Sequence, residues 1–142
     1  MAANASSSAP GPSADDQAAL AGLPQRLVEV WAAHDADGFG DLFTEDGTLV
    51  LPGVYQAGRD AIRSFMREAF AGVYKGTRVT GKPVNARFLA PGVALLITEG
   101  GVIEAGRTEL ADEAAIRAGW LAVKQDGEWL LAAYQNSPRD PA

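Results

Sequence analysis

Residues 31–52 read W-A-A-H-D-A-D-G-F-G-D-L-F-T-E-D-G-T-L-V-L-P. This stretch predicts the end of a long amphipathic helix, a polar joint, a short second helix, and a turn into a strand at residues 48–51. The short helix would carry Phe39, Leu42 and Phe43, which would pack under the sheet. A helical layer is thereby set against the first strand of a sheet, and this junction decides the fold.

The helix before the joint has its start signal at Ser13, an N-cap residue type with Asp16 three positions later. Apolar and aromatic residues then recur at steps of three and four and fall on one helical face: Leu20, Leu23, Leu27, Val30, Trp31 and His34. Pro24 lies within this run, and a proline in a helix interior costs about 3 kcal/mol and removes a backbone donor. The sequence therefore predicts a kinked or two-part helix, or one whose regular part begins near Leu23.

Residues 35–46 have part of the spacing of a calcium-binding loop, with acidic residues at its first and third positions and a glycine at its sixth. The fifth and ninth positions are Phe39 and Phe43, which offer no oxygen ligand, and the twelfth is Asp rather than the required Glu. We therefore interpret Asp35 or Asp37 as the cap of the short helix, and we predict no metal site.

A second amphipathic helix runs from Gly58 to a stop at Gly72, and its apolar face comprises Ile62, Phe65, Met66, Ala69 and Phe70. Beyond it the pattern changes to β-like runs at residues 77–79, 84–89, 93–103, 118–124 and 129–136. Asp126-Gly127, between the last two runs, predicts a tight hairpin. Helices first and strands afterwards indicate an α+β domain with a curved, mostly antiparallel sheet.

The chain has 142 residues, of which 47% are hydrophobic, and this fits one domain with a substantial core. We place that domain at residues 14–137, between a disordered tail at 1–13 and a short C-terminal tail at 138–142. The first residues lack the charged start and apolar run of a secretory signal, and no stretch approaches the ~20 apolar residues of a membrane span. We expect a soluble, cytoplasmic protein.

Charge and composition exclude several classes of function. The net charge is −6 and Lys and Arg are scattered, so the chain has no basic footprint for nucleic acid. The chain has no cysteine, which removes disulfides, thiolate nucleophiles and zinc–sulfur sites. There is also no G-x-G-x-x-G after a strand, no G-K-[ST] and no metal triad, so we expect no cofactor.

The last predicted strand has two apolar faces. Side chains alternate along a strand, so one face would hold Trp129, Leu131, Ala133 and Gln135, and the other Leu130, Ala132, Tyr134 and Asn136. One face would meet the helices, and the other needs cover. We therefore predict a homodimer through the outer face of the sheet.

Three segments carry a resemblance to a known family. W-x-x-x-D-x-x-x-F-x-x-L-F-x-x-D-G spans residues 31–47, G-R-D-A-I-R-S-F-M opens a helix at Gly58, and D-G-E-W-L-L-A-A-Y-Q-N-S spans residues 126–137. Residues 16–137 as a whole resemble the nuclear transport factor 2-like (NTF2-like, SnoaL-like) superfamily, and within it the SgcJ/EcaC family. That family includes small proteins encoded with enediyne polyketide synthases.

The resemblance implies an α+β, cone-shaped NTF2-like fold in which three N-terminal helices pack on the curved sheet around an internal pocket, usually as a dimer. It also implies a cofactor-independent accessory protein of polyketide (enediyne) antibiotic biosynthesis. Such a protein would bind an apolar, polyene-like intermediate and assist its cyclisation or proton transfer. A ligand-binding or carrier module without chemistry and an oligomeric assembly module of the same fold are the alternatives.

The chain departs from two enzyme groups that the superfamily contains. In an alignment by eye through L-F-x-x-D-G-T, the general-base Asp of steroid isomerase-like members corresponds to Leu51, and their assisting tyrosine falls near Leu27. Neither side chain can carry a proton. SnoaL-type cyclases use a His and an Asp on later strands, whereas the single histidine here, His34, lies on a helix. Whether the protein is an enzyme of the cyclase or isomerase kind therefore stays open.

Four polar residues are the catalytic candidates: His34, Tyr55, Glu99 and Asn136. His34 ends the first helix, where the helix dipole favours a positive imidazole, and a structural role is its alternative. Glu99 lies in the apolar run at residues 93–103, where burial would raise the pKa of its carboxyl group and suit it to acid–base work. An outward-facing residue at the strand surface is the alternative for Glu99.

Tyr55 follows a Pro-Gly turn at the expected mouth of the pocket. Of Gln135 and Asn136 only one can point inward, and we favour Asn136, on the same face as Tyr134. Arg87 could bind an acidic or carbonyl group, with a solvated strand residue as its alternative.

Large apolar side chains would form both the core and the pocket wall, because the two overlap in a cone-shaped fold. They are Trp31, Phe65, Met66, Phe70 and Trp120, and Arg87 and Tyr134 complete the predicted ligand-binding set. Such a wall suits a long, flat, apolar ligand such as a polyene.

Overall fold

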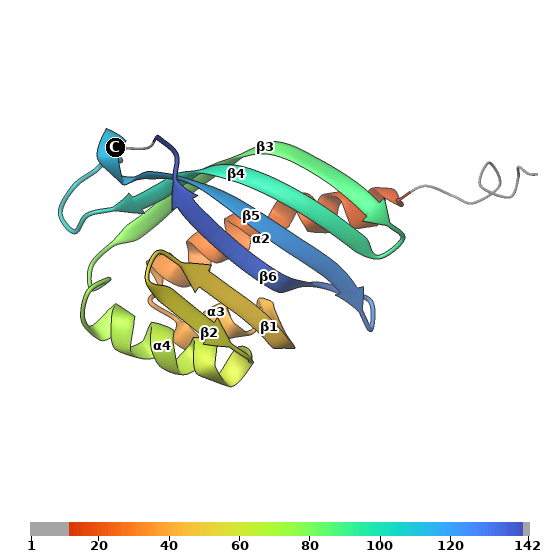
Figure 1. Cartoon of the computed structure of the whole chain (residues 1–142), viewed down its shortest axis with the longest axis horizontal. Helices are drawn as coiled ribbons and strands as arrows, with labels where there is room; N and C mark the ends of the chain where they lie inside the picture. The colour runs from red at the N-terminus through yellow and green to blue at the C-terminus, as the bar shows by residue number, and fades with distance from the viewer. Residues whose placement is uncertain (1–11, 141–142) are drawn as a thin grey trace, which may run out of the picture.

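Figure 1 shows the computed structural model, which describes residues 12–140, as a strongly curved sheet with helices on its concave side. Of the two predicted tails, residues 1–11 and 141–142 lie outside the described residues. In chain order the elements are α2 (Ala14–Ala32), α3 (Ala36–Gly40), β1 (Phe43–Leu51), β2 (Val54–Ala57), α4 (Arg59–Ala71), β3 (Arg78–Ala90), β4 (Val93–Ile103), a 3-10 turn η1 (Asp112–Ala114), β5 (Ala115–Gln125) and β6 (Glu128–Pro138).

The sheet has six strands in the order β2-β1-β6-β5-β4-β3. Neighbouring strands are antiparallel except β1 and β6, which are parallel. Helix α2 crosses behind β3 to β6, while α3 and α4 lie beside β1 and β2 (Figure 1). The predicted α+β class with three helices on a curved, mostly antiparallel sheet is confirmed for the described part of the chain.

Helix α2 is continuous across Pro24, so the predicted two-part helix is wrong. Its N-terminus is capped as predicted, since the Ser13 hydroxyl accepts the Asp16 backbone N–H at 3.0 Å. Leu20, Leu23 and Trp31 are buried on the face that meets the sheet, and Pro24 is buried with them. Burial of one such side chain contributes roughly 1.5–3 kcal/mol, so several of them offset the local cost of the proline.

The junction after α2 has the predicted order of elements but different boundaries. The Asp35 carboxylate caps α3 by accepting the Gly38 N–H at 2.9 Å, as we interpreted. The helix ends at Gly40, so Leu42 and Phe43 lie outside it, and β1 starts at Phe43 rather than at residue 48. The strand starts early because this segment already pairs with β6: the Leu42 carbonyl accepts a hydrogen bond from the Leu131 N–H at 2.7 Å.

Strand β6 contains an irregularity that changes which residues share a face. Leu131 pairs with Ala122 and Ala133 pairs with Leu121, so Ala132 is one extra residue in β6. Beyond this bulge the alternation is inverted. Trp129 and Leu131 therefore face the helices together with Tyr134 and Asn136, and the simple alternation predicted for this strand is wrong.

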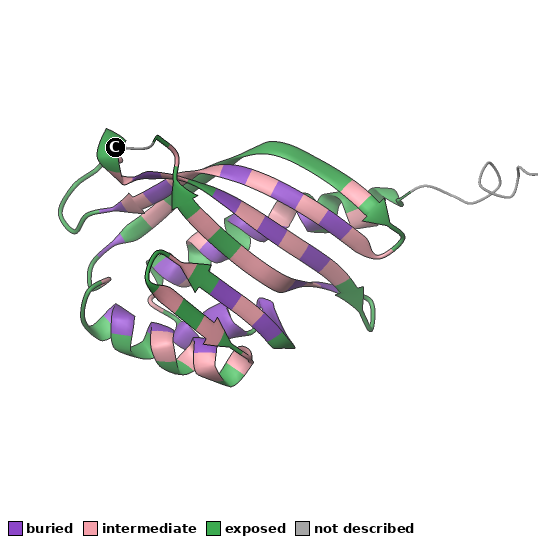
Figure 2. Ribbon diagram, viewed as in Figure 1, coloured by how far each residue is buried: buried purple, intermediate pink, exposed green. Residues whose placement is uncertain are grey.

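Strand β3 joins two predicted runs into one long edge strand. Pro83 lies inside it at a register shift, where a missing backbone donor is tolerated because no further strand of residues 12–140 pairs with this edge. Most of β3 is exposed, whereas buried residues alternate with partly buried ones along β4 and β5 (Figure 2). The hairpin between β5 and β6 forms at Asp126-Gly127, as predicted, and both residues have positive φ.

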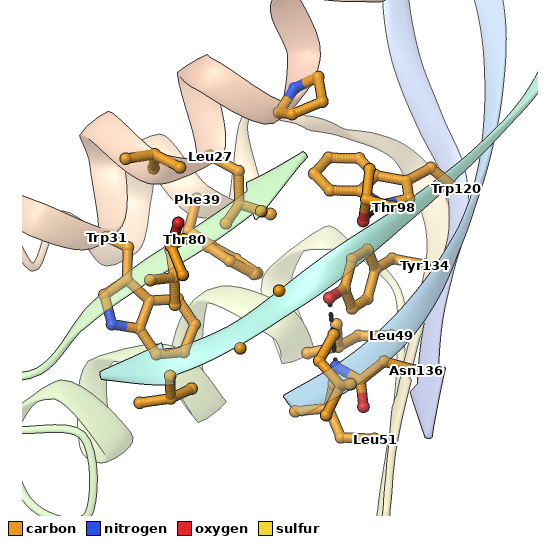
Figure 3. Close-up of a pocket in the computed structure, with 18 of the residues that line it drawn as sticks. Leu27, Trp31, Phe39, Leu49, Leu51, Thr80, Thr98, Trp120, Tyr134 and Asn136 are labelled. Atoms are coloured by element: carbon orange, nitrogen blue, oxygen red, sulfur yellow. Dashed lines mark hydrogen bonds between the residues drawn. The ribbon is translucent and has the colours of Figure 1, made fainter. Parts of the chain in front are cut away.

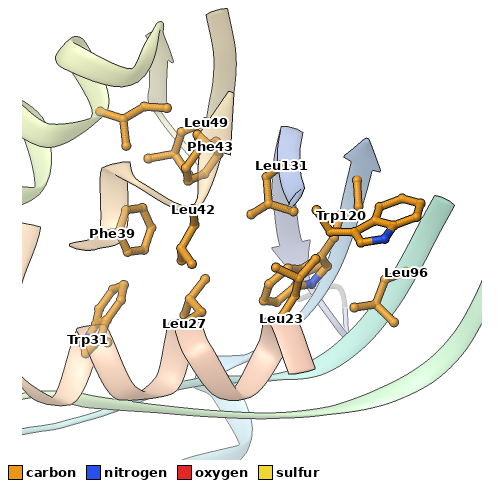
Figure 4. Close-up of a cluster of buried hydrophobic side chains, with 14 of the residues drawn as sticks. Leu23, Leu27, Trp31, Phe39, Leu42, Phe43, Leu49, Leu96, Trp120 and Leu131 are labelled. Atoms are coloured by element: carbon orange, nitrogen blue, oxygen red, sulfur yellow. The ribbon is translucent and has the colours of Figure 1, made fainter. Parts of the chain in front are cut away.

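The buried side chains lie between the three helices and the inner face of the sheet, as Figure 4 shows for Leu23, Leu27, Phe43 and Leu131. No helix within residues 12–140 is long and apolar enough to cross a membrane.

One carboxylate fastens the start of α2 to the far end of the sheet. The Asp16 carboxylate accepts a hydrogen bond from the Lys124 ammonium at 2.9 Å and another from the Trp129 indole N–H at 3.0 Å. These two hydrogen bonds lower the pKa of Asp16 to about 2. The helix is thereby held at one end by β5 and β6 together, 108 or more residues away in sequence.

We expect Asp16→Asn to lower the melting temperature at neutral pH and to lower it progressively less as the pH falls from about 4 to about 2. The lowered pKa means that the carboxylate stabilises the fold above its ordinary value of 3.8 and loses this effect as it protonates. Thermal unfolding across this pH range measures the difference. Asp15→Asn, one residue away in the same helical turn, is the control, and an equal effect of both substitutions would contradict the prediction.

Candidate functional site

A cavity lies between α2, α3 and the inner face of the sheet. It encloses about 650 Å³ when its open mouth is counted, and the centre of a water-sized sphere can occupy about 70 Å³ of it. Figure 3 shows α2 on one side of this space and the strands that carry Trp120, Tyr134 and Asn136 on the other. The cavity is a narrow slot, with room for a compact or flat molecule.

Two tryptophans form walls of the slot, and each has its polar atom satisfied. The Trp31 indole N–H donates to the Thr77 hydroxyl at 3.0 Å, and the Trp120 indole N–H donates to the Thr98 hydroxyl at 2.9 Å. The Trp120 ring meets the Tyr134 ring edge to face, with centroids 5.1 Å apart. Because both N–H groups are engaged by the protein, the indoles offer a ligand their apolar surface alone.

Tyr134 and Asn136 form the polar end of the cavity. The β6 bulge turns both side chains inward, and the Asn136 amide donates to the Tyr134 hydroxyl oxygen at 3.1 Å (Figure 3). No residue of the described chain accepts the Tyr134 hydroxyl proton, which can therefore be donated to a bound molecule. Burial raises the pKa of Tyr134, and the Asn136 hydrogen bond opposes this only in part. The phenol is therefore neutral, and a donor, throughout the physiological range.

Tyr134 is the sole titratable side chain among the described residues that line the cavity. The other lining side chains are apolar except Thr80, Thr98 and Asn136. A buried charge needs a partner or many hydrogen bonds, and these walls supply no charged partner. The cavity is consequently built for a neutral ligand.

The structure brings five of the predicted residues together at this cavity: Trp31, Met66, Trp120, Tyr134 and Asn136. The prediction that Asn136 rather than Gln135 points inward, beside Tyr134, agrees with the geometry. Six other predicted residues lie elsewhere, and these placements correct the predicted pocket.

Three of those six lie on the helical side of the domain. His34 follows α2 with a φ of 52°, packs edge-on against Phe70 with ring centroids 5.0 Å apart, and has a buried Nε2 without a partner in the described chain. Phe70 is buried in the core beside Trp31. Phe65 lies toward a separate surface groove between β2 and α4, because it is one helical position away from the buried face. None of the three reaches the cavity.

The other three lie on the outer face of the sheet. Glu99 pairs with Arg117 at 2.7 Å, cross-strand partners that both point away from the helices. Tyr55 pairs with Val50 on that side and is 68% exposed, because residues 54–57 form β2 instead of leading directly into a helix. Arg87 is exposed on the edge strand. The alternatives we gave for Glu99 and Arg87, an outward-facing and a solvated residue, are the ones that the structure shows.

Sequence reasoning missed several cavity residues. Leu49 and Leu51 of β1 line the cavity, and so do Thr98 and the glycines at residues 100 and 101. A signal for Thr98 was present, because a hydroxyl within an apolar strand needs a partner, and an indole N–H is a suitable one. No pattern in the sequence indicates which of the glycines line a cavity.

We expect Thr98→Val to lower the free energy of unfolding by about 1–3 kcal/mol, because it leaves the buried Trp120 N–H without an acceptor at nearly constant side-chain shape. Thr98→Ser keeps the hydroxyl and serves as the control. Urea unfolding of the three proteins measures the effect, and a Val variant as stable as the Ser variant would contradict this role of Thr98.

Comparisons with known proteins agree with this geometry. The model of the SnoaL-like domain matches residues 25–92. A solved domain of unknown function with a cystatin-like fold from Nostoc punctiforme is 25% identical, with a TM-score of 0.84 over 91% of this chain and 80% of that one. An NTF2-like protein with a cystatin-like fold from Novosphingobium aromaticivorans is 18% identical, with a TM-score of 0.77 over 90% and 84%.

A third solved structure is a ketosteroid isomerase-like protein from Erwinia carotovora atroseptica, 17% identical, with a TM-score of 0.72 over 91% of this chain and 100% of that one. A search of curated proteins found no match. The chain therefore has the cystatin-like, NTF2-like fold, and its match to the SnoaL-like domain supports its place in the SnoaL-like / NTF2-like superfamily.

Proposed function

We propose that the protein binds a neutral, flat, largely apolar small molecule in the cavity beneath α2, without a cofactor, and orients it through Tyr134 and Asn136. A polyketide intermediate, such as the polyene of an enediyne pathway, is the ligand class that we infer from the family resemblance. The observation that carries the proposal is the apolar slot whose sole titratable lining residue, within the described chain, is Tyr134.

The walls select against charge and favour unsaturated carbon. A carboxylate or ammonium entering the slot would lose its hydration and find no counter-charge. Flat conjugated surfaces match the faces of Trp31 and Trp120, whose N–H groups are already engaged. The slot holds a compact molecule, and a longer chain would extend through the mouth.

The polar end favours a ligand oxygen. A carbonyl oxygen can accept the Tyr134 hydroxyl proton in a hydrogen bond while Asn136 holds the phenol oxygen in place. This contact would polarise the carbonyl and fix the direction in which the ligand enters. No carboxylate or imidazole lines the described cavity, so any proton transfer would depend on the Tyr134 hydroxyl alone. Binding and orientation are therefore the primary function that we propose, and a carrier role needs nothing more.

Binding can be tested with prodan, a neutral two-ring fluorescent ketone whose emission shifts to the blue in apolar surroundings. We expect saturable binding, and we expect Tyr134→Phe to weaken it roughly threefold to tenfold through loss of one hydrogen bond. Because burial raises the pKa of Tyr134, the affinity should stay constant up to the ordinary tyrosine range near pH 10.

Tyr55→Phe and Glu99→Gln are the matched controls, because both residues lie on the outer face and should leave the affinity unchanged. Absence of saturable binding would overturn the proposed function. A larger effect of Glu99→Gln than of Tyr134→Phe would place the site elsewhere.

A second copy of the chain is the partner that we propose for the outer face of the sheet. Leu95, Ile97 and Leu121 on the central strands are only partly covered. Val50, which is 37% exposed, lies on the same face, separated from Ile97 by Gln135 and Gly119. The Glu99–Arg117 pair beside them offers opposite charges that a twofold-related copy could match. A stable dimer interface buries about 1,200–2,000 Å² of surface in total, and an interface of this size would cover the apolar residues of this face.

We expect Ile97→Lys to convert a dimer into a monomer, because it places a charge in the centre of the proposed interface. Val73→Lys is the control, since Val73 is 78% exposed beyond the end of α4 and lines the surface groove between α4 and β2. Light scattering coupled to size-exclusion chromatography measures the mass. A monomeric wild-type protein would contradict the proposal.

A further inference from the structure

One wall of the cavity consists of backbone rather than side chains. Gly81 of β3 and Gly100 of β4 face each other in register, and Gly101 follows. All three line the cavity. Glycine in a strand interior weakens the strand, and it marks a bend or a place where a ligand or another backbone approaches closely. Each of these glycines therefore calls for a physical reason.

Packing explains two of the three. A Cβ atom at Gly100 would overlap the Thr80 carbonyl oxygen, and it would lie 2.5 Å from the Gly81 Cα atom. A Cβ atom at Gly101 would lie 2.5 Å from the Ala114 carbonyl oxygen. Real side chains do not fit at such distances, so the close approach of neighbouring backbone requires glycine at both positions.

Packing does not explain Gly81. The sole heavy atom within 4 Å of a Cβ placed there is the Glu99 carbonyl oxygen, at 3.8 Å, which is ordinary van der Waals contact. Gly81 is also not among the residues with positive φ, so its backbone conformation suits any L-residue. Neither a clash nor the backbone conformation forbids a side chain at this position.

A side chain at Gly81 would point toward the cavity, as the pairing of β3 with β4 indicates. Val79 pairs with Val102, and Pro83 pairs with Thr98, and three of these four residues line the cavity. Gly81 lies between Val79 and Pro83, two positions from each, so its side-chain direction is the same as theirs. Gly81 itself is exposed, so a side chain there would point toward the cavity at its solvent-exposed rim.

We propose that Gly81 is the residue that sets which ligands fit: its bare backbone leaves room for the bulk of a fused-ring or substituted ligand beside β3. The inference rests on the proposed function, since it concerns the same cavity. It specifies the ligand class as one wider than a single ring, which would contact the glycine wall directly, whereas a one-ring ligand would leave this part of the slot unfilled.

The experiment compares two neutral ketones, acetophenone with one ring and prodan with two fused rings, against Gly81→Ala and Gly81→Val. We expect Gly81→Val to weaken prodan binding at least about tenfold and acetophenone binding less than about twofold, with Gly81→Ala intermediate for prodan. Isothermal titration calorimetry measures both affinities, and circular dichroism confirms that each variant is folded. Gly81→Ala keeps the test available if the larger substitution prevents folding.

Gly119→Ala is the matched control. Gly119 lies within β5, a central strand, whereas Gly81 lies on the edge strand. A Cβ atom at Gly119 has the same 3.8 Å clearance to its nearest neighbour, which is Gln135 on the outer face. It should leave both affinities unchanged. Equal binding of prodan to wild type and Gly81→Val, or an equal loss for both ketones, would overturn the inference alone. Failure of both ketones to bind wild type would overturn the proposed function and the inference together.

Discussion

The extra residue in β6 is the constraint on which the site depends. Without Ala132 as a bulge, Tyr134 and Asn136 would face away from the helices whenever Trp129 and Leu131 faced toward them. With it, one strand supplies core residues at its start and the polar end of the cavity at its finish. The parallel pairing of β1 with the same strand then brings Leu49 and Leu51 beside these polar groups.

Local patterns predicted the helices and most of the strands but not β2, and pairing between distant segments decided their limits. The helix at residues 59–71 and the strand at residues 93–103 follow from periodicity and from flanking turn residues. The early start of β1 and the continuity of α2 across Pro24 depend on β6 and on packing against the sheet, which no window along the sequence contains. The same holds for the bulge in β6, since a single alanine among alanines gives no sign of it.

Five of the eleven residues predicted for the site lie at the cavity, and they are mainly those of its apolar wall. Large apolar residues at helical spacing indicate the face that packs on the core, so Trp31 and Met66 could be assigned from spacing alone. Charged residues on strands could not, because alternation leaves the choice of face open until the register is known. Glu99 is paired with Arg117 on the outer face, and among the described residues no carboxylate or imidazole lines the cavity.

The long edge strand β3 has a consequence for edge-to-edge pairing between copies of this protein. Thirteen residues of exposed backbone would ordinarily offer a template for another chain's strand, with aggregation as the result. Pro83 removes one donor from that edge, the register shifts at residues 83–85 and 88–90 break its regularity, and Lys82 and Arg87 add charge to it. Arg87, an exposed residue of this strand, thus adds a charge that opposes the pairing of a further strand with this edge.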